Sequence, residues 1–422
     1  MSEVVSVRAE GDTPVKESPE SAGTPRTLPG LRLAASAIGV YLMLRALSLE
    51  VMYVLASYAH ARAPGRQVYP DGSIGNQWRS FTSIMDALVS WDGRWYVKIA
   101  GGGLGGPVGA VDADGVPYEL RLAFFPLYPW LARPLTFLPF VSPVAACLIV
   151  SFLSAVAAAW GLYAVGRHVG GHRVGVMLAA VWAIAPAAMT QNGAYTESLF
   201  TALAAWALYA VLTERWLLAG ALAAVSGLSR PTAAALIGTV GLAALVAAIS
   251  RRGGWRPYAA MLLAPAGLLA YFAFAAARLG GFSRYTDLHH NTFGARWDNG
   301  ENTWGMVSDI LFGVDDDNAA KPIRVLSLVM LAAFVVLLVL LVPRVPWQLT
   351  VFAAAMLVLA TGTSTHISMI GRHLMPAFPV LLIPAMLLAR AATRDRIIVL
   401  GLLALLSGWY AGWLPFISGQ AI

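Results

Sequence analysis

Apolar runs of about 20 residues recur along most of this 422-residue chain, and they limit its fold more than any other feature. A run of that length is what an α-helix needs to cross the hydrocarbon core of a bilayer. The composition agrees, because 58% of the residues are hydrophobic and only 12% are charged, against about 25% charged in an ordinary soluble domain. Backbone polar groups within a bilayer must be paired inside the structure, so the sequence predicts an all-α polytopic membrane protein.

We expect a bundle of about eleven transmembrane helices. Their approximate ranges are 31–57, 142–166, 174–190, 196–213, 216–228, 232–249, 257–278, 325–342, 347–361, 373–389 and 396–416. Residues 1–30 are rich in Pro, Glu, Ser and Thr and are expected to be a disordered cytoplasmic tail. The transmembrane domain then comprises residues 31–422, with two long polar loops at about 58–141 and 279–324.

Basic residues in the short loops predict the orientation of the chain. With a cytoplasmic N-terminus, the short outer loops contain only Arg230 and Arg372, and all other short-loop arginines lie inside. The inner arginines are Arg167, Arg173, Arg215, Arg251, Arg252, Arg256, Arg344, Arg390, Arg394 and Arg396. This distribution follows the positive-inside rule and places both long loops on the extracytoplasmic side of a cell membrane.

Unusual polar stretches gather on that outer side. The stretch Ser90–Gly106, "SWDGRWYVKIAGGGLGG", lies in the first large loop. Three shorter stretches, 191–200, 227–233 and 364–376, fall in outer connections. Their common side predicts one site at the outer membrane surface.

Asp92 is the leading candidate for chemistry in this site. Trp91 and Trp95 flank it, and indole rings favour the membrane–water interface. A carboxylate held there can accept a proton from a hydroxyl during group transfer. The alternative is structural, since Ser90 or Asp92 could cap a short amphipathic helix that continues to about Ala100.

Three further charged residues are candidates for the same site. Glu197 begins an apolar span, where it could hold a substrate hydroxyl or act as the first-turn acid of a helix. Arg230 and Arg372, the latter followed by His373, can bind phosphate because an arginine fork matches phosphate oxygens. The alternative for Arg372 is an ion pair with Glu197 or with an outer-loop aspartate.

An aromatic stretch precedes the second span. Residues 120–135 contain Phe125, Tyr128 and neighbouring prolines, and they predict a rigid re-entry of the chain into the membrane. This stretch could form an interfacial aromatic belt or a cradle for a lipid chain. No metal site is predicted, because the adjacent His289 and His290 would point apart on a helix and no Walker or HExxH sequence is present. Arg45, inside the first span, is expected to contact another span.

Two of these stretches resemble a known family. "WDGRWYVKIA" (91–100), followed by "AFFPLYP" (123–129), is similar to the PIG-V type of mannosyltransferase in the GT-C superfamily. The family's acidic position falls on Asp92, and "YTESLF" (195–200) matches a further family stretch. The resemblance covers roughly residues 35–400, and a composition rich in Ala, Gly and Arg suggests an actinobacterial member.

The resemblance implies an activity. GT-C enzymes use a sugar carried on polyprenyl phosphate, invert its anomeric centre, and use an acid of the outer loop as base. A mannosyl or other hexosyl transfer to a lipid or glycolipid acceptor is therefore expected, with Asp92 as base and no cofactor beyond the donor. The implied partners are the lipid-linked donor, the acceptor and membrane lipid, and no nucleic acid. The divalent-metal requirement stays open. The alternative is a transporter or flippase of lipid-linked sugars.

Overall fold

The computed structural model describes residues 30–62, 84–313, 321–364 and 369–418. The expected tail lies outside this part of the chain, except for Gly30. Within the described ranges the chain is helical, and extended pairing is limited to two single bridges, Val111 with Pro117 and Trp297 with Thr363. The all-α prediction is confirmed.

Most expected spans are helices with nearly the expected ends. They are α1 (Leu31–Arg62), α6 (Glu197–Leu212), α7 (Trp216–Ser226), α8 (Ala233–Ile249), α13 (Lys321–Leu341), α14 (Trp347–Gly362) and α17 (Thr393–Trp413). Five helical segments of the described chain are long and apolar enough to cross a bilayer, and five shorter apolar helices accompany them. The chain is therefore a multi-pass membrane protein.

Two expected spans adjoin each other in one element, and another span is broken. The spans predicted at 142–166 and 174–190 correspond to the two helical halves of α5 (Pro143–Ala183), which are separated by the non-helical residues Gly170 and Gly171. The kink lies at Gly171, whose φ of 84° is in the left-handed region that glycine adopts without strain. The span predicted at 257–278 is divided into α9 (Arg256–Leu263) and α10 (Ala266–Leu279) at Pro265, which lacks the N–H that an unbroken helix needs.

The span predicted at 373–389 is also broken. It consists of α15 (Ile370–Leu374), the 3-10 turn η5 (Phe378–Leu381) and α16 (Leu382–Arg390). Pro376 and Pro379 fall at the break and remove two backbone donors. The hydropathy of the segment could not show this interruption, which sets Arg372 on a short helix of its own.

The two long loops contain short helices. The first has α2 (Ile84–Leu88), α3 (Asp92–Gly102), η1 (Tyr118–Ala123), α4 (Leu127–Ala132) and η2 (Arg133–Phe137). The second has α11 (Phe282–Phe293) and α12 (Glu301–Phe312), and two single turns, η3 (Ala188–Gln191) and η6 (Leu414–Ser418), adjoin spans.

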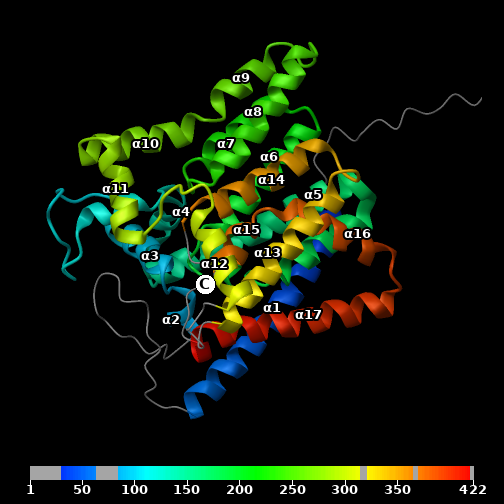
Figure 1. Cartoon of the computed structure of the whole chain (residues 1–422), viewed down its shortest axis with the longest axis horizontal. Helices are drawn as coiled ribbons and strands as arrows, with labels where there is room; N and C mark the ends of the chain where they lie inside the picture. The colour runs from blue at the N-terminus through cyan, green and yellow to red at the C-terminus, as the bar shows by residue number, and fades with distance from the viewer. Residues whose placement is uncertain (1–29, 63–83, 314–320, 365–368, 419–422) are drawn as a thin grey trace, which may run out of the picture.

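Small residues let the central helices approach closely. Helix α5 packs against α1 and α6, and α1 also packs against α17 (Figure 1). A Cβ atom on Gly408 would lie 2.5 Å from the carbonyl oxygen of Ser48, so this contact between α17 and α1 requires glycine. Arg45 of α1 donates to the carbonyl of Ala183 at 3.0 Å and to the side chain of Asn192. This confirms the expected contact of Arg45 with another span.

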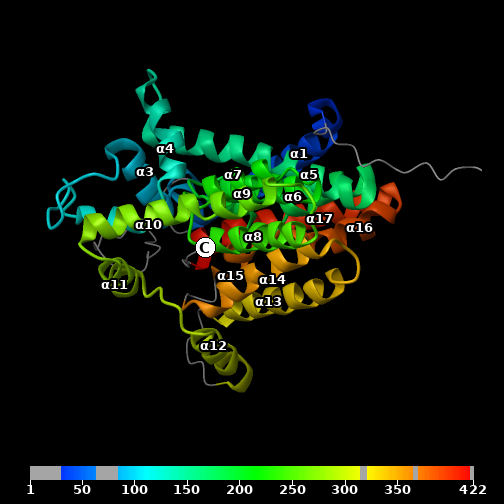
Figure 2. The ribbon, with the colours of Figure 1, turned by 90° about the horizontal axis from the view of Figure 1, so that it is seen from above.

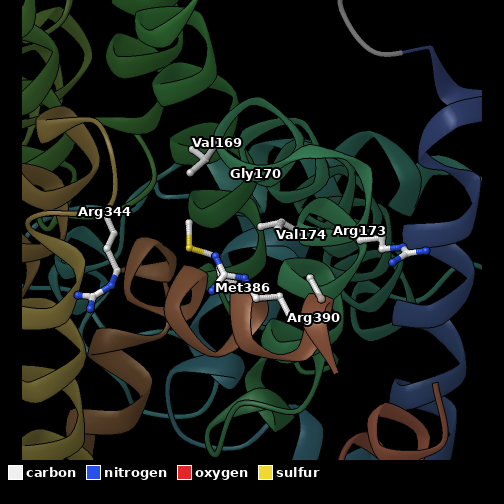
Figure 3. A pocket seen from close by; sticks show the side chains of 8 residues that line it. Val169, Gly170, Arg173, Val174, Arg344, Met386 and Arg390 are labelled. Carbon is white, nitrogen blue, oxygen red and sulfur yellow. The ribbon is translucent and has the colours of Figure 1, made fainter. Parts of the chain in front are cut away.

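The bundle has two chemically different ends. Helices α2, α3, α4 and α11 lie at one end, and the C-terminus of α16 lies at the other (Figures 1 and 2). At the α16 end, Arg173, Arg344 and Arg390 line a hollow of about 470 Å³, and Arg173 and Arg344 point to opposite sides of it (Figure 3). Three arginines predicted in separate inner loops thus lie together, as the predicted topology requires. The side of the membrane that they face stays a prediction.

Candidate functional site

A cavity of about 350 Å³ lies at the α3 end of the bundle, lined by residues of α3, α11, α14 and α15 and by the residues before α8. One part of its lining is polar and includes Asp92, Arg230 and Arg372. The other part is apolar and includes Phe293 of α11 and Met356 of α14. A cavity of this kind suits a ligand with a charged head and a hydrocarbon part.

Four charged side chains form one ion-pair cluster beside this cavity. Arg372 Nη2 lies 2.6 Å from Asp92 Oδ2, and Arg372 Nε donates to Glu197 Oε1 at 2.6 Å. Arg230 Nη1 lies 3.1 Å from the same Glu197 oxygen. The polar stretches that the sequence assigned to one surface therefore meet at one place, although Asp92 and Arg372 are 280 residues apart in the sequence.

The two carboxylates differ in their access to the cavity. The Asp92 side chain is 37% exposed and lines the cavity, whereas the Glu197 side chain is fully buried and does not line it. Glu197 is the first residue of α6, so the helix N-terminus also stabilises its charge. A bound molecule can thus reach Asp92, and Glu197 acts on it only through the arginines.

The loop before α3 determines where Asp92 lies. Trp91, at the N-terminal boundary of α3, has a φ of 54°, which is rare for a side chain of this size. Two long-range hydrogen bonds hold the loop: Ala194 N donates to the Leu88 carbonyl at 2.8 Å, and the Tyr195 hydroxyl donates to the Ser90 carbonyl at 3.0 Å. The capping alternative is not observed, since no side chain caps α3 and the Ser90 hydroxyl donates backwards to a carbonyl.

The guanidinium of Arg372 is occupied in this structure. It bridges Asp92 and Glu197, and its carbon lies 4.7 Å from the centre of the Tyr195 ring. The structure therefore shows the ion pair that was the alternative for Arg372. The arginine pairs with Glu197 and also with an aspartate of the first long loop, Asp92. His373, the next residue, lines the cavity.

Several polar atoms around the cavity lack partners among the described residues. Arg230 Nε makes no hydrogen bond there, and neither do Trp91 Nε1 and Thr232 Oγ1, although all three atoms are buried. An unpaired buried donor costs roughly 1–3 kcal/mol. A polar ligand in the cavity could satisfy these groups.

Aromatic rings form a wall of the cavity, here defined as Trp95, Phe124, His289 and Phe293. Trp95 stacks on Phe124 with 5.3 Å between centroids, and Phe293 meets both edge-on. Phe125 also lines the cavity and packs on Tyr271 at 4.4 Å.

Tyr128 lies behind this wall rather than in the cavity. It is fully buried, its hydroxyl donates to the Cys147 carbonyl at 2.7 Å, and the same hydroxyl lies 2.8 Å from Ser151 Oγ. The structure therefore gives Tyr128 a packing contact between α4 and α5, where the sequence suggested a contact with substrate.

Residues of α11 were not recognised from the sequence as part of the site. His289 and Phe293 belong to the second long loop, and no local signal there shows that α11 folds against α3 and η1. The spacing of four residues between them, which places both on one helix face, was the one available indication. The described residues contain no group of three or more His, Cys, Asp or Glu side chains suited to a metal ion.

A second charged cluster supports the segment 103–123 beside α3. Asp112 accepts hydrogen bonds from Arg121 at 2.9 Å and from Lys98 at 3.2 Å, and its other oxygen accepts from the backbone of Val116. Burial acts to raise the pKa of the Asp112 carboxyl, but these hydrogen bonds outweigh it and hold the pKa well below its ordinary value. Asp112 thus fastens the 103–123 segment to α3 through Lys98.

Comparison with known proteins supports the fold. No protein-family model and no curated protein matches the chain. Two solved structures of ArnT from Cupriavidus metallidurans are similar to it at 14% identity, each alignment covering 86% of this chain and 62% of ArnT. The TM-score is 0.50 for the apo state and 0.48 for the form bound to undecaprenyl phosphate. The chain thus spans less than two thirds of ArnT, and its fold is the expected GT-C-like helical bundle.

Proposed function

We propose that the protein is a GT-C-type glycosyltransferase that moves a hexosyl group from a polyprenyl-phosphate donor to a hydroxyl of a lipid or glycolipid acceptor. One observation carries this proposal. A reachable carboxylate, Asp92, and an arginine whose Nε has no partner among the described residues, Arg230, line the same half-apolar cavity. Mannose as the sugar follows from the sequence resemblance, and the placing of the reaction at the extracytoplasmic face follows from the distribution of the short-loop arginines. Residues 31–422 would form a single transferase domain.

Asp92 is the proposed base. The acceptor hydroxyl attacks the anomeric carbon, the new C–O bond forms as the bond to the phosphate oxygen breaks, and the hydroxyl proton passes to Asp92. A single displacement of this kind inverts the anomeric centre. Arg372 fixes the direction of the Asp92 carboxylate, and Glu197 holds Arg372 through its second contact. Glu197 itself cannot meet the acceptor, because it is fully buried.

Arg230 is the proposed principal partner of the donor phosphate. Its Nε has no partner among the described residues and its Nη1 contacts one carboxylate, whereas Arg372 binds two. Charge-assisted bonds from a guanidinium stabilise a phosphate that gains negative charge as it leaves. His373 and Trp91 are further candidates for this head group, since both line the cavity.

The apolar part of the cavity is the proposed place for the first prenyl units. Phe125, Met356 and Leu359 offer hydrocarbon and aromatic surface there. Undecaprenyl phosphate, the ligand in one ArnT structure, belongs to the proposed lipid class, but the proposal rests on the residues of this chain.

The transporter alternative finds less support. A transporter needs ionisable groups near the midplane, typically in paired positions of two repeats. Broken segments do occur, in α9–α10 and in α15–α16. The charged cluster, however, lies at helix starts beside the first loop and contains a reachable base, which transport does not require.

The test uses the full chain in lipid nanodiscs with labelled polyprenyl-phosphate-mannose and a lipid extract as acceptor. We expect a labelled lipid product of inverted configuration. Asp92→Asn should bind donor normally but turn over on the order of a hundredfold or more slowly, since general-base catalysis contributes about 10²–10⁴ in rate. Asp114→Asn, in the same loop and 65% exposed, is the matched control. Normal turnover by Asp92→Asn would show that the base is elsewhere.

A further inference from the structure

The aromatic wall contains one side chain that is not purely apolar. His289 lies one helical turn before Phe293 on α11, and its ring packs 4.8 Å from the Tyr285 ring and 6.2 Å from the Phe293 ring. Phe293 in turn meets Trp95 and Phe124 edge-on. These ring contacts on both sides fix the imidazole as part of the cavity lining.

The imidazole has an unused hydrogen-bonding atom. His289 Nε2 is buried and has no partner among the residues that the structure describes. Burial lowers the pKa of His289 below its ordinary value, so the ring is neutral at pH 7. A neutral imidazole has one donor and one acceptor nitrogen, and it has no charge with which to attract an anion.

A lipid-linked sugar has three parts, a prenyl chain, a phosphate and a sugar ring, and they differ in how well they fit the aromatic wall. A prenyl chain against His289 would leave the buried Nε2 unpaired, which is unfavourable. A phosphate is better bound by Arg230, which is charged and whose Nε has no partner among the described residues. A sugar ring suits the wall, because its C–H faces pack on aromatic rings and its hydroxyls both donate and accept.

We propose that His289 binds a hydroxyl of the transferred sugar through Nε2, which makes the aromatic wall the sugar subsite of the cavity. This inference rests on the proposed function, and it adds a specificity residue from the second long loop. His289 contacts the sugar only. It is distinct from the phosphate partner Arg230 and from the base Asp92.

The test compares two lipids that differ only in the sugar. Dissociation constants of polyprenyl-phosphate-mannose and of bare polyprenyl phosphate are measured for the full chain in nanodiscs. His289→Phe keeps the aromatic wall but removes the nitrogen, and it should weaken binding of the sugar-bearing lipid roughly tenfold while leaving the bare lipid phosphate unchanged. His289→Gln places an amide near the Nε2 position and should restore most of the loss. Arg230→Gln should weaken binding of both lipids.

Controls make each outcome decisive. His290→Phe changes the neighbouring exposed histidine and should bind both lipids as the wild type does. Equal affinity of His289→Phe and wild type for the sugar-bearing lipid would overturn the inference alone. An equal loss for both lipids would also overturn it, since His289 would then act on the phosphate or on folding. Binding of neither lipid by the wild-type protein would instead overturn the proposed function, and this inference with it.

Discussion

At the scale of single residues, the site depends on how two positive charges are shared by two carboxylates. Arg372 bridges Asp92 and Glu197 with two contacts of 2.6 Å, and Arg230 adds a third to Glu197 at 3.1 Å. The planar guanidinium can donate to two carboxylates at once from different nitrogens, and a single ammonium cannot reproduce that geometry. The direction of the Asp92 carboxylate is therefore set by the shape of the Arg372 side chain as well as by its charge.

Arg372→Lys tests this dependence. We expect turnover to fall roughly ten- to a hundredfold, because small misplacements of a reacting group have costs of that order. Donor binding should change little, since the variant leaves Arg230 in place, with an Nε that has no partner among the described residues. Initial rates and donor affinity of the variant are compared with those of Arg344→Lys, at the opposite end of the bundle. Unchanged turnover in Arg372→Lys would contradict the bridging role.

At the scale of elements, the connection between η3 and α6 positions α3. Gly193 permits this contact: a Cβ atom there would lie 2.6 Å from the Tyr195 ring and 2.8 Å from the Leu88 carbonyl. Leu88 ends α2, and its carbonyl accepts the hydrogen bond from Ala194 that holds the loop before Asp92. The two motif stretches are thus in backbone contact.

Gly193→Ala should therefore disturb the site without touching any charged residue. We expect a loss of stability of about 1–3 kcal/mol from overpacking, together with lower turnover as the α2–α3 connection moves. Thermal unfolding in detergent and the transfer assay measure the two effects. Gly105→Ala, whose added Cβ would meet nothing within 4 Å, should behave as wild type. A fully stable and active Gly193→Ala would show that the contact is not needed.

The Asp112 cluster predicts a pH-dependent contribution to stability. Because its pKa is lower in the folded state than its ordinary value of about 4, ionised Asp112 stabilises the fold above that pH. This contribution is lost as the pH falls through the folded-state pKa. Asp112→Asn should unfold more easily at pH 7 by about 1–3 kcal/mol, and the difference from wild type should narrow below about pH 4. Melting curves at several pH values, with Asp114→Asn as control, check this; a difference independent of pH would argue against it.

Hydropathy predicted the helices whose apolar runs are uninterrupted, such as α6, α8 and α13. It could not predict the broken spans, because Pro265 and Pro376 hardly change the mean hydropathy of their segments while removing backbone donors. It did separate the two halves of α5, which the non-helical residues Gly170 and Gly171 divide in the structure.

At the scale of the whole molecule, the positive-inside pattern predicted which charged stretches would meet. Asp92, Glu197, Arg230 and Arg372 come from four separate connections and do form one cluster. The pairing within the cluster was left open, because Arg372 has two acids within reach and only tertiary structure determines which of them it binds. His289 was missed as a site residue for a related reason, since nothing in α11 itself indicates which helices it packs against.

The membrane orientation is the corresponding prediction for the whole molecule. In a Cys147→Ser background, a cysteine at the exposed Val108 should react with an impermeant maleimide applied to intact cells. A cysteine at Arg252 should react only after the cells are permeabilised, because the arginine-rich end is expected inside. Labelling of position 252 in intact cells would reverse the orientation and place the candidate site in the cytoplasm.

The long separation within the central ion pair has a consequence for biosynthesis. Glu197 and Arg372 are 175 residues apart, so the ribosome adds the arginine roughly 10 to 35 seconds after the glutamate at about 5–20 residues per second. During that interval Glu197 has only Arg230 of the two cations, and Asp92 has no Arg372 to bind. A nascent chain that stalls before α15 therefore has Asp92 without Arg372 and Glu197 with Arg230 alone, which distinguishes its site from that of the finished protein.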